Sequence, residues 1–119
     1  NTARITFVNG DERYFVEGAS LGGGRILITS INGLTCEVNA TSPTVIVQQH
    51  DVKGVVSDVS TLLAFNDINI GVMKVSRTSR GDLAYCVIEC DDIIPDHVIK
   101  GLKRINNVIS ATVINIKGD

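Results

Sequence analysis

The chain has 119 residues, of which 44% are apolar, 20% charged and 4% aromatic, a composition typical of one globular domain or of one domain with an additional fragment. Its formal net charge is −2, so it lacks the basic excess of proteins that bind nucleic acid or anionic lipid. No apolar run approaches the roughly 20 residues that a membrane span needs, and we expect neither a nucleic-acid nor a membrane partner.

The cysteine pattern predicts neither a disulfide scaffold nor a zinc ribbon. The chain has an odd number of cysteines, namely Cys36, Cys86 and Cys90, and none of them lies in a C-x-x-C pair. Cys86 and Cys90 would share one face of a strand as small apolar side chains. A reducing cytoplasm is therefore expected. The start at Asn1, without a signal-peptide pattern, favours a fragment of a longer protein.

Residues 1–42 are predicted to be all-β. Asn9–Gly10 and Asn32–Gly33 are turn signals of two hairpins, and the glycine-rich Gly18–Gly24 is predicted to join them. Four short strands without a helix bury too little apolar surface for independent stability. We therefore expect these strands to be covered by a partner from upstream or from another chain.

A domain boundary is predicted near Asn39–Pro43, which is small, polar and ends in a proline. Residues 1–42 then form a partial β-rich segment and residues 43–119 a second domain, in which strands alternate with two amphipathic helices. The second helix contains Gly101. This glycine indicates either close packing against a neighbouring element or no structural requirement at that position. The predicted elements are strands at 45–49, 68–78, 83–90 and 108–116, a helix over about 54–66, and a helix from Pro95 to about Asn106.

This β-α-β-β-α-β order predicts an α+β, ferredoxin-like fold with both helices on one face of an antiparallel sheet. Val72 and Met73, like Ala84 to Val87, place apolar residues on both sides of their strands. We therefore expect the second face of the sheet to be covered by another sheet or subunit.

No catalytic constellation and no metal-ligand spacing is found. His50–Asp51 and Asp91–Asp92 with His97 are better explained as solvated loops or helix caps. A phosphate loop at Gly18–Gly24 is disfavoured against a tight crossover or a close backbone approach, because a strand follows it. Arg77–Arg80 at a hairpin tip could contact an anion, although a solvated turn is favoured.

The junction from Asp51 to Val55, between the first strand and first helix of the second segment, is the most informative motif. A helix N-terminus can hold a carboxylate and an aspartate can hold an ammonium, so together they could clamp a zwitterionic amino acid. Asn69, at the start of the next strand, is expected to lie close by. The alternative is that Asp51 merely caps the helix.

Four stretches of the second segment resemble an ACT domain, a small-molecule-sensing module usually paired with another copy. The resemblance covers residues 44–117, and its Ser-Arg-Thr-x-Arg-Gly signature is similar to that of bacterial iron-sulfur-dependent L-serine dehydratases. Residues 1–4 and 18–26 resemble the later half of the allosteric substrate-binding domain that precedes the ACT domain in the beta chain of those enzymes. The stretches of the second segment are Asp51–Val59, Asn66–Ile70, Ser76–Gly81 and Val87–Asp91.

The resemblance implies a regulatory role without catalytic residues in this chain. Conversion of L-serine to pyruvate and ammonia on a [4Fe-4S] cluster would belong to a separate alpha chain or region. L-serine or a related amino acid would bind at an interface with a second ACT domain, in a homodimer. Asp51 replaces an asparagine and Lys53 a proline found in many ACT domains. The ligand-binding residues implied are Asp51, Val52, Lys53, Gly54, Val55, Val56, Asn69 and Ile70.

A ligand-free module remains as an alternative, whereas RNA binding is disfavoured. A ligand-free ACT module would act only in dimerisation or as a structural element. RNA binding on the open sheet face would need exposed aromatic and basic residues on the strands, and Tyr85 is the single strand aromatic of the second segment.

Overall fold

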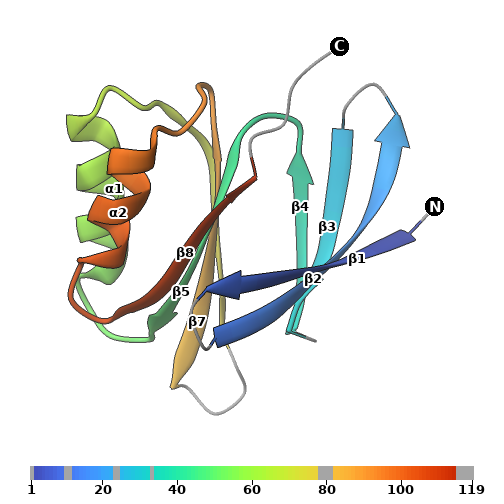
Figure 1. Ribbon diagram of the computed structural model, residues 1–119, viewed down its shortest axis with the longest axis horizontal. Helices are drawn as coiled ribbons and strands as arrows, with labels where there is room; N and C mark the ends of the chain where they lie inside the picture. Colours follow the sequence, from blue (N-terminus) through green and yellow to red (C-terminus); the bar gives the residue numbers. More distant parts are fainter. Residues whose placement is uncertain (1, 10–11, 23–24, 33, 78–81, 115–119) are drawn as a thin grey trace.

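The computed structural model describes residues 2–9, 12–22, 25–32, 34–77 and 82–114. They form two four-stranded antiparallel sheets and one helical layer (Figure 1). The elements are β1 (Thr2–Asn9), β2 (Glu12–Gly22), β3 (Arg25–Ile31), β4 (Leu34–Ala40), β5 (Thr44–His50), α1 (Val55–Phe65), β6 (Ile70–Arg77), β7 (Leu83–Cys90), α2 (Asp96–Lys103) and β8 (Val108–Ile114).

The second segment has the predicted ferredoxin-like topology. Its strand order is β6-β7-β5-β8, and all neighbouring strands are antiparallel. Both helices lie on one side of this sheet (Figure 1). The α+β, β-α-β-β-α-β prediction is therefore confirmed.

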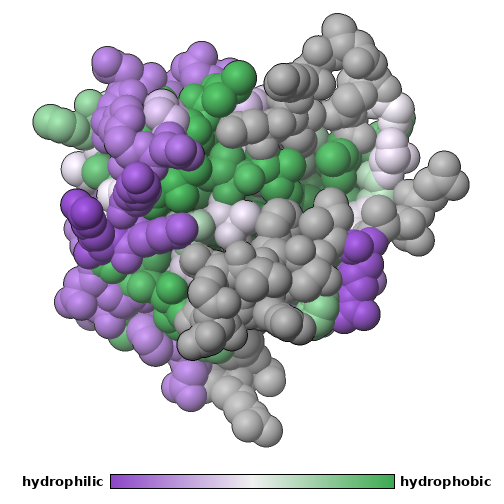
Figure 2. All heavy atoms as spheres, viewed as in Figure 1, coloured by the Kyte–Doolittle hydropathy of each residue, from purple (hydrophilic) through white to green (hydrophobic). Residues whose placement is uncertain are grey.

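The helices form where the apolar period predicted them. Val55, Val59 and Leu63 of α1 are fully buried because they recur on one helical face, as do Val98 and Leu102 of α2. On the face drawn in Figure 2, hydrophilic side chains gather over the helical layer and hydrophobic ones toward the middle of the molecule. The layer therefore presents a polar outer surface.

Two details of α2 refine its prediction. Pro95 is the N-cap residue, with an extended ψ of 153°, whereas the sequence predicted it at the first helical position. At Gly101, an added Cβ would lie 3.1 Å from Leu62 Cδ2 of α1. Close packing of the two helices therefore explains this glycine.

The opposite face of the β6-β7-β5-β8 sheet is covered by the β1-β2-β3-β4 sheet, which confirms that another sheet covers it. The two sheets share an apolar core without a helix between them. The expectation that residues 1–42 are covered from upstream or from another chain is wrong for this face, because strands downstream in the same chain cover it. The boundary near residue 42 stays a prediction. The shared core consists of Val16, Ile28, Ile31, Cys36, Val38, Ala40, Ile46, Tyr85 and Val87.

Residues 18–22 of the glycine-rich stretch belong to a strand and not to a joining loop, whereas Gly23 and Gly24 lie outside the described residues. β2 continues to Gly22, and the register with β3 shifts between Glu17 and Gly18 and again between Ser20 and Gly22. A Cβ on Gly18 would lie 2.6 Å from the Leu27 carbonyl oxygen. Glycine thus allows β3 to approach closely at a bulge, the alternative favoured over a phosphate loop.

The two predicted hairpin turns differ in how far they are described. Asn32 has a φ of +51°, the left-handed conformation that an Asn-Gly turn requires, and Gly33 lies outside the described residues. At the first turn, Asn9 pairs with Glu12, while Gly10 lies outside the described residues. Among the described residues, no helix is long and apolar enough to cross a membrane.

The close approach at Gly18 predicts a marked cost for a methyl group there. Gly18→Ala is expected to lower the free energy of unfolding by about 1–3 kcal/mol, because either Leu27 or β2 must move. Gly71→Ala is the matched control, since its Cβ would lie 3.6 Å from the nearest atom, the Glu89 carbonyl oxygen. Urea unfolding measures both variants, and equal stability of the two would contradict this explanation.

Candidate functional site

An ion pair marks the junction between β5 and α1. Asp51, half-buried just after β5, has its Oδ1 3.3 Å from Nε of Arg77, the last residue of β6. β7 lies between these strands, and the small Ala84, which pairs with Arg77, is fully buried there. The Asp51 N–H also donates to the Asp82 carbonyl oxygen at 3.2 Å. The loop is therefore tied to both β6 and β7.

The N-terminus of α1 is open at this junction. Gly54 is the N-cap residue, with a left-handed φ of +92°, and none of the described side chains caps the helix. The alternative in which Asp51 caps α1 is therefore excluded. The N–H groups of the first turn have no acceptor within the helix and lie at its positive end, so they can bind a carboxylate.

A cavity of about 400 Å³ lies between this junction and the end of β6. It brings together five of the predicted ligand-binding residues with three residues outside that set, of which the sequence indicated only Arg77, as a possible anion contact. Val55, also predicted, is buried in the helix-facing core. The predicted lining residues are Asp51, Val52, Lys53, Gly54 and Val56, and the additional ones are Gln49, Val75 and Arg77.

Gln49 is the most informative of the additional residues. It is 2% exposed, and its Oε1 has no hydrogen-bond partner among the described residues. A buried carbonyl oxygen without a donor is costly unless a ligand or water completes it. One sequence signal pointed here: Gln49 continues the alternation of Val45 and Val47, which face the helices, so a polar residue occupies a core position.

Asn69 and Ile70 do not lie with the other predicted site residues. His50 pairs with Leu83, whereas Ile70 pairs with Cys90, so the two segments lie at opposite ends of β7. The expectation that Asn69 lies close to Asp51 within one chain is wrong, because β5 and β6 run in the same direction. Asn69 Nδ2 instead donates to Asp91 Oδ2 at 2.6 Å.

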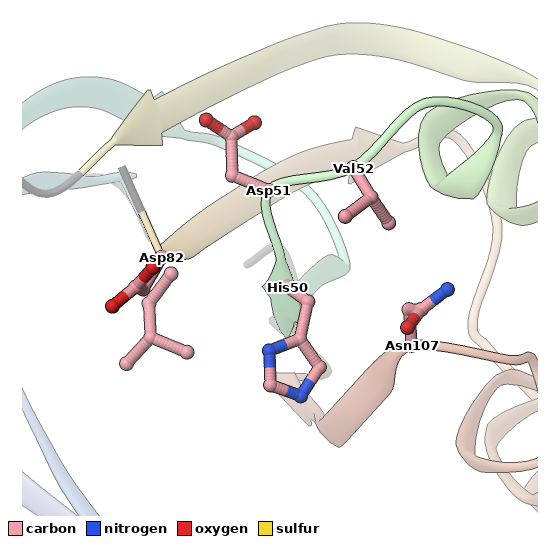
Figure 3. A pocket seen from close by; sticks show the side chains of 6 residues that line it. His50, Asp51, Val52, Asp82 and Asn107 are labelled. Carbon is pink, nitrogen blue, oxygen red and sulfur yellow. The ribbon is translucent and has the colours of Figure 1, made fainter. Parts of the chain in front are cut away.

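A second cavity, of about 550 Å³, lies on the other side of the β5 end. Figure 3 shows the His50 ring turned toward it and the Asp51 carboxylate turned away from the ring. Asp82, Leu83 and Asn107 complete its wall together with Val52. His50 and Asp51 therefore form no acid-base pair, in agreement with the interpretation as a solvated loop.

The other histidine neighbourhood is also explained locally. His97 Nε2 lies 3.3 Å from Asn66 Oδ1, which links the start of α2 to the end of α1. Within the described parts of the chain, no group of three or more His, Cys, Asp or Glu residues is placed to hold a metal ion. The hairpin tip at residues 78–81 lies outside the described residues, whereas Arg77 belongs to β6.

The three cysteines pack in the two cores, as predicted for small apolar residues. Cys86 and Cys90 face the helices, while Cys36 lies between the two sheets. Burial raises the pKa of Cys86 to about 12, and burial together with Asp91 and other nearby carboxylates raises that of Cys90 to about 11. Cys86 and Cys90 lie on one side of the β6-β7-β5-β8 sheet and Cys36 on the other, so the three thiols do not fit the joint ligation of an iron-sulfur cluster.

Comparison with known proteins identifies the family. Residues 44–113 match the ACT domain. The chain belongs to the ACT-domain family. This ACT domain and its N-terminal sheet are 37% identical over 114 residues to the probable L-serine dehydratase beta chain of Bacillus subtilis (strain 168), covering 96% of this chain and 52% of that protein. The L-serine dehydratase beta chain of Peptoniphilus asaccharolyticus is 25% identical over 118 residues, covering 98% and 53%.

The chain is also similar to part of an enzyme of a different kind. The D-3-phosphoglycerate dehydrogenase of Bacillus subtilis (strain 168) is 32% identical over 89 residues, which cover 75% of this chain and 17% of that protein. The chain spans about half the length of the two dehydratase beta chains. The predicted resemblance is thus confirmed, and the similarities support a regulatory, amino-acid-sensing ACT domain.

The buried thiols predict a loss of stability at alkaline pH. Above pH 9.0 the unfolded thiols ionise while Cys86, with a pKa of about 12, keeps its proton in the folded chain. The unfolded state then binds fewer protons, so stability falls by about 1.4 kcal/mol per pH unit for each such thiol. Urea unfolding at pH 8 and at pH 10 measures the drop in the free energy of unfolding between the two pH values. This drop is expected to be smaller for Cys86→Ala than for the unmodified chain, and equal drops would contradict the explanation.

Proposed function

We propose that this ACT domain is the L-serine-sensing part of an iron-sulfur-dependent L-serine dehydratase, and that L-serine binds at the β5–α1 junction. The observation that carries the proposal is the set of groups around the 400 Å³ cavity. An anion and a cation lie at its mouth in the Asp51–Arg77 pair, an uncapped helix begins there, and a buried amide oxygen lacks a donor.

These groups match a zwitterion with a hydroxyl group. The ligand carboxylate would accept hydrogen bonds from the first-turn N–H groups of α1, and Asp51 would bind the ammonium group. Gln49 Oε1 would accept a hydrogen bond from the serine hydroxyl. Alanine lacks that hydroxyl and would leave the buried oxygen unpaired, which gives a physical basis for discrimination between the two amino acids.

The ion pair itself can be exchanged for contacts with the ligand. The Arg77 side chain is 69% exposed and that of Asp51 23% exposed, so their mutual attraction is weakened by solvent. A zwitterion offers its ammonium group to Asp51 and a carboxylate, bound at the first turn of α1, that Arg77 could also contact. Binding would therefore replace one exposed ion pair by two charge-assisted hydrogen bonds.

A second copy of the chain can supply Asn69 and Ile70. β6 is an edge strand, and its Val72 and Val75 are 39% and 40% exposed. If β6 pairs antiparallel with β6 of a second copy, the start of one strand lies beside the end of the other. Asn69 of that copy would then approach Arg77 and the cavity, which accounts for a site built from both predicted segments.

In the assembled enzyme, the ACT domain would act on a catalytic alpha chain or region that converts L-serine to pyruvate and ammonia. The [4Fe-4S] cluster would belong to that partner, since the cysteines of this chain do not fit one. Serine would regulate the partner by favouring one domain arrangement over another. A cytoplasmic location follows from this assignment. The role of the ACT domain would be regulatory and not catalytic.

The exposed β6 edge also supports a second candidate, a ligand-free module that serves only in dimerisation. In that case Val72 and Val75 would be buried between copies, and the chain would form a dimer with equal stability in the presence and absence of amino acids.

Thermal unfolding with L-serine distinguishes the two candidates. At about 100 times its dissociation constant, L-serine is expected to add about 2.7 kcal/mol, a rise in Tm on the order of 10 °C. D-serine and L-alanine should give smaller shifts. Asp51→Asn should remove the response, while Asp58→Asn, an exposed first-turn aspartate of α1, should keep it. No shift with any ligand would support the dimerisation module.

Mixing two variants tests whether the site is shared between copies. Asp51→Ala and Asn69→Ala chains should each fail to bind L-serine, because each lacks one side of every site. After unfolding and refolding together, half the dimers should carry one intact site, so roughly a quarter of all sites should return. Isothermal titration measures that fraction. Full binding by Asn69→Ala alone would show that Asn69 contributes nothing.

A further inference from the structure

Two adjacent glutamines at the end of β5 lie on opposite sides of the central sheet. Gln49 faces the helices and lines the cavity, and its buried Oε1 has no hydrogen-bond partner among the described residues. Gln48 faces the N-terminal sheet, because side chains alternate along a strand. There its Nε2 donates to the Tyr85 hydroxyl oxygen at 3.4 Å, and its Oε1 accepts from Ser110 Oγ at 3.3 Å. The end of β5 thus connects the cavity with polar groups between the sheets.

These polar groups continue into the N-terminal sheet through Asn32. Asn32 Nδ2 donates to the Tyr85 hydroxyl oxygen at 2.6 Å. Asn32 is also held on β2, because its N–H donates to the Phe15 carbonyl oxygen at 2.8 Å and its Oδ1 accepts from the Phe15 N–H at 2.7 Å. Tyr85, only 3% exposed, therefore joins the β3–β4 hairpin to β5 across the apolar core.

The backbone is irregular where the two glutamines meet. In the pairing of β5 with β8, the register shifts between Gln48, which pairs with Ser110, and Gln49, which pairs with Val108. A bulge interrupts the regular ladder and bends the strand. The direction of Gln49 is therefore set at an irregularity that begins at Gln48.

We infer that Tyr85 is a positioning residue: its hydroxyl holds Gln48, and through it the Gln49 amide, in the orientation that the cavity uses. The N-terminal sheet then becomes part of the sensing mechanism, since Asn32 fixes the same hydroxyl. Coupling of this kind is reciprocal. A ligand that bonds Gln49 stabilises the docking of the β1–β4 sheet, and the docked sheet raises the affinity for the ligand. The inference rests on the proposed function for the identity of that ligand.

A double-mutant cycle on the whole chain tests the coupling, with L-serine as the probe and isothermal titration as the readout. Tyr85→Phe keeps the buried ring and should weaken L-serine binding about 5-fold or more. In a Gln49→Ala background the same substitution should change the affinity little, because the residue through which it acts is gone. Ser60→Ala is the control: its hydroxyl donates to the Ser57 carbonyl oxygen on α1, and affinity should be unchanged. An equal loss in both backgrounds, or none in the first, would overturn the inference.

A measurement without ligand tests the positioning role of Tyr85 independently of L-serine binding. In two-dimensional NMR spectra of the chain without ligand, Tyr85→Phe should shift the Gln49 side-chain amide signals, whereas Ser60→Ala should not. An unmoved Gln49 signal would overturn the positioning role. If the unmodified chain does not bind L-serine at all, the proposed function fails, and the spectra still decide whether Tyr85 positions Gln49.

Discussion

Burial of one sheet on both faces is the constraint on which the rest of this molecule depends. Val45 and Val47 of β5 pack against the helices, and Ile46 between them packs against the N-terminal sheet. Because both faces are covered, β7 consists almost entirely of apolar residues and β5 carries the continuous apolar run Val45–Val47, and the hydrophobic effect holds three layers together. The β1–β4 sheet obtains from this arrangement the core that its own strands could not provide.

The polar chemistry gathers where β5 leaves this double burial. Gln48 is bonded to polar groups between the sheets, Gln49 remains incomplete on the helical side, and Asp51 reaches across to Arg77. Within four residues, Gln48 and Gln49 thus lie on the two faces of the sheet and Asp51 contacts its edge strand. A strand end of this kind can hold a small ligand in a fixed geometry, because the layers behind it are closely packed.

Periodicity in the sequence predicted the parts of the fold that depend on local pattern. The stripe of Val55, Val59 and Leu63 located α1, and apolar residues on both sides of β7 predicted that a second layer covers the sheet. Which layer covers it depends on packing between distant segments, which a local pattern does not encode. The unpartnered oxygen of Gln49 likewise becomes visible only when its neighbours are known, and the distance of Asn69 follows from strand direction.

The most direct test of the central claim is a crystal structure of the chain grown with L-serine. We expect serine at the β5–α1 junction, with its carboxylate at the first turn of α1, its ammonium group at Asp51, its hydroxyl at Gln49, and Asn69 of a second copy beside it. Serine bound instead in the cavity around His50 and Asn107, or a dimer whose junctions face away from each other, would contradict it.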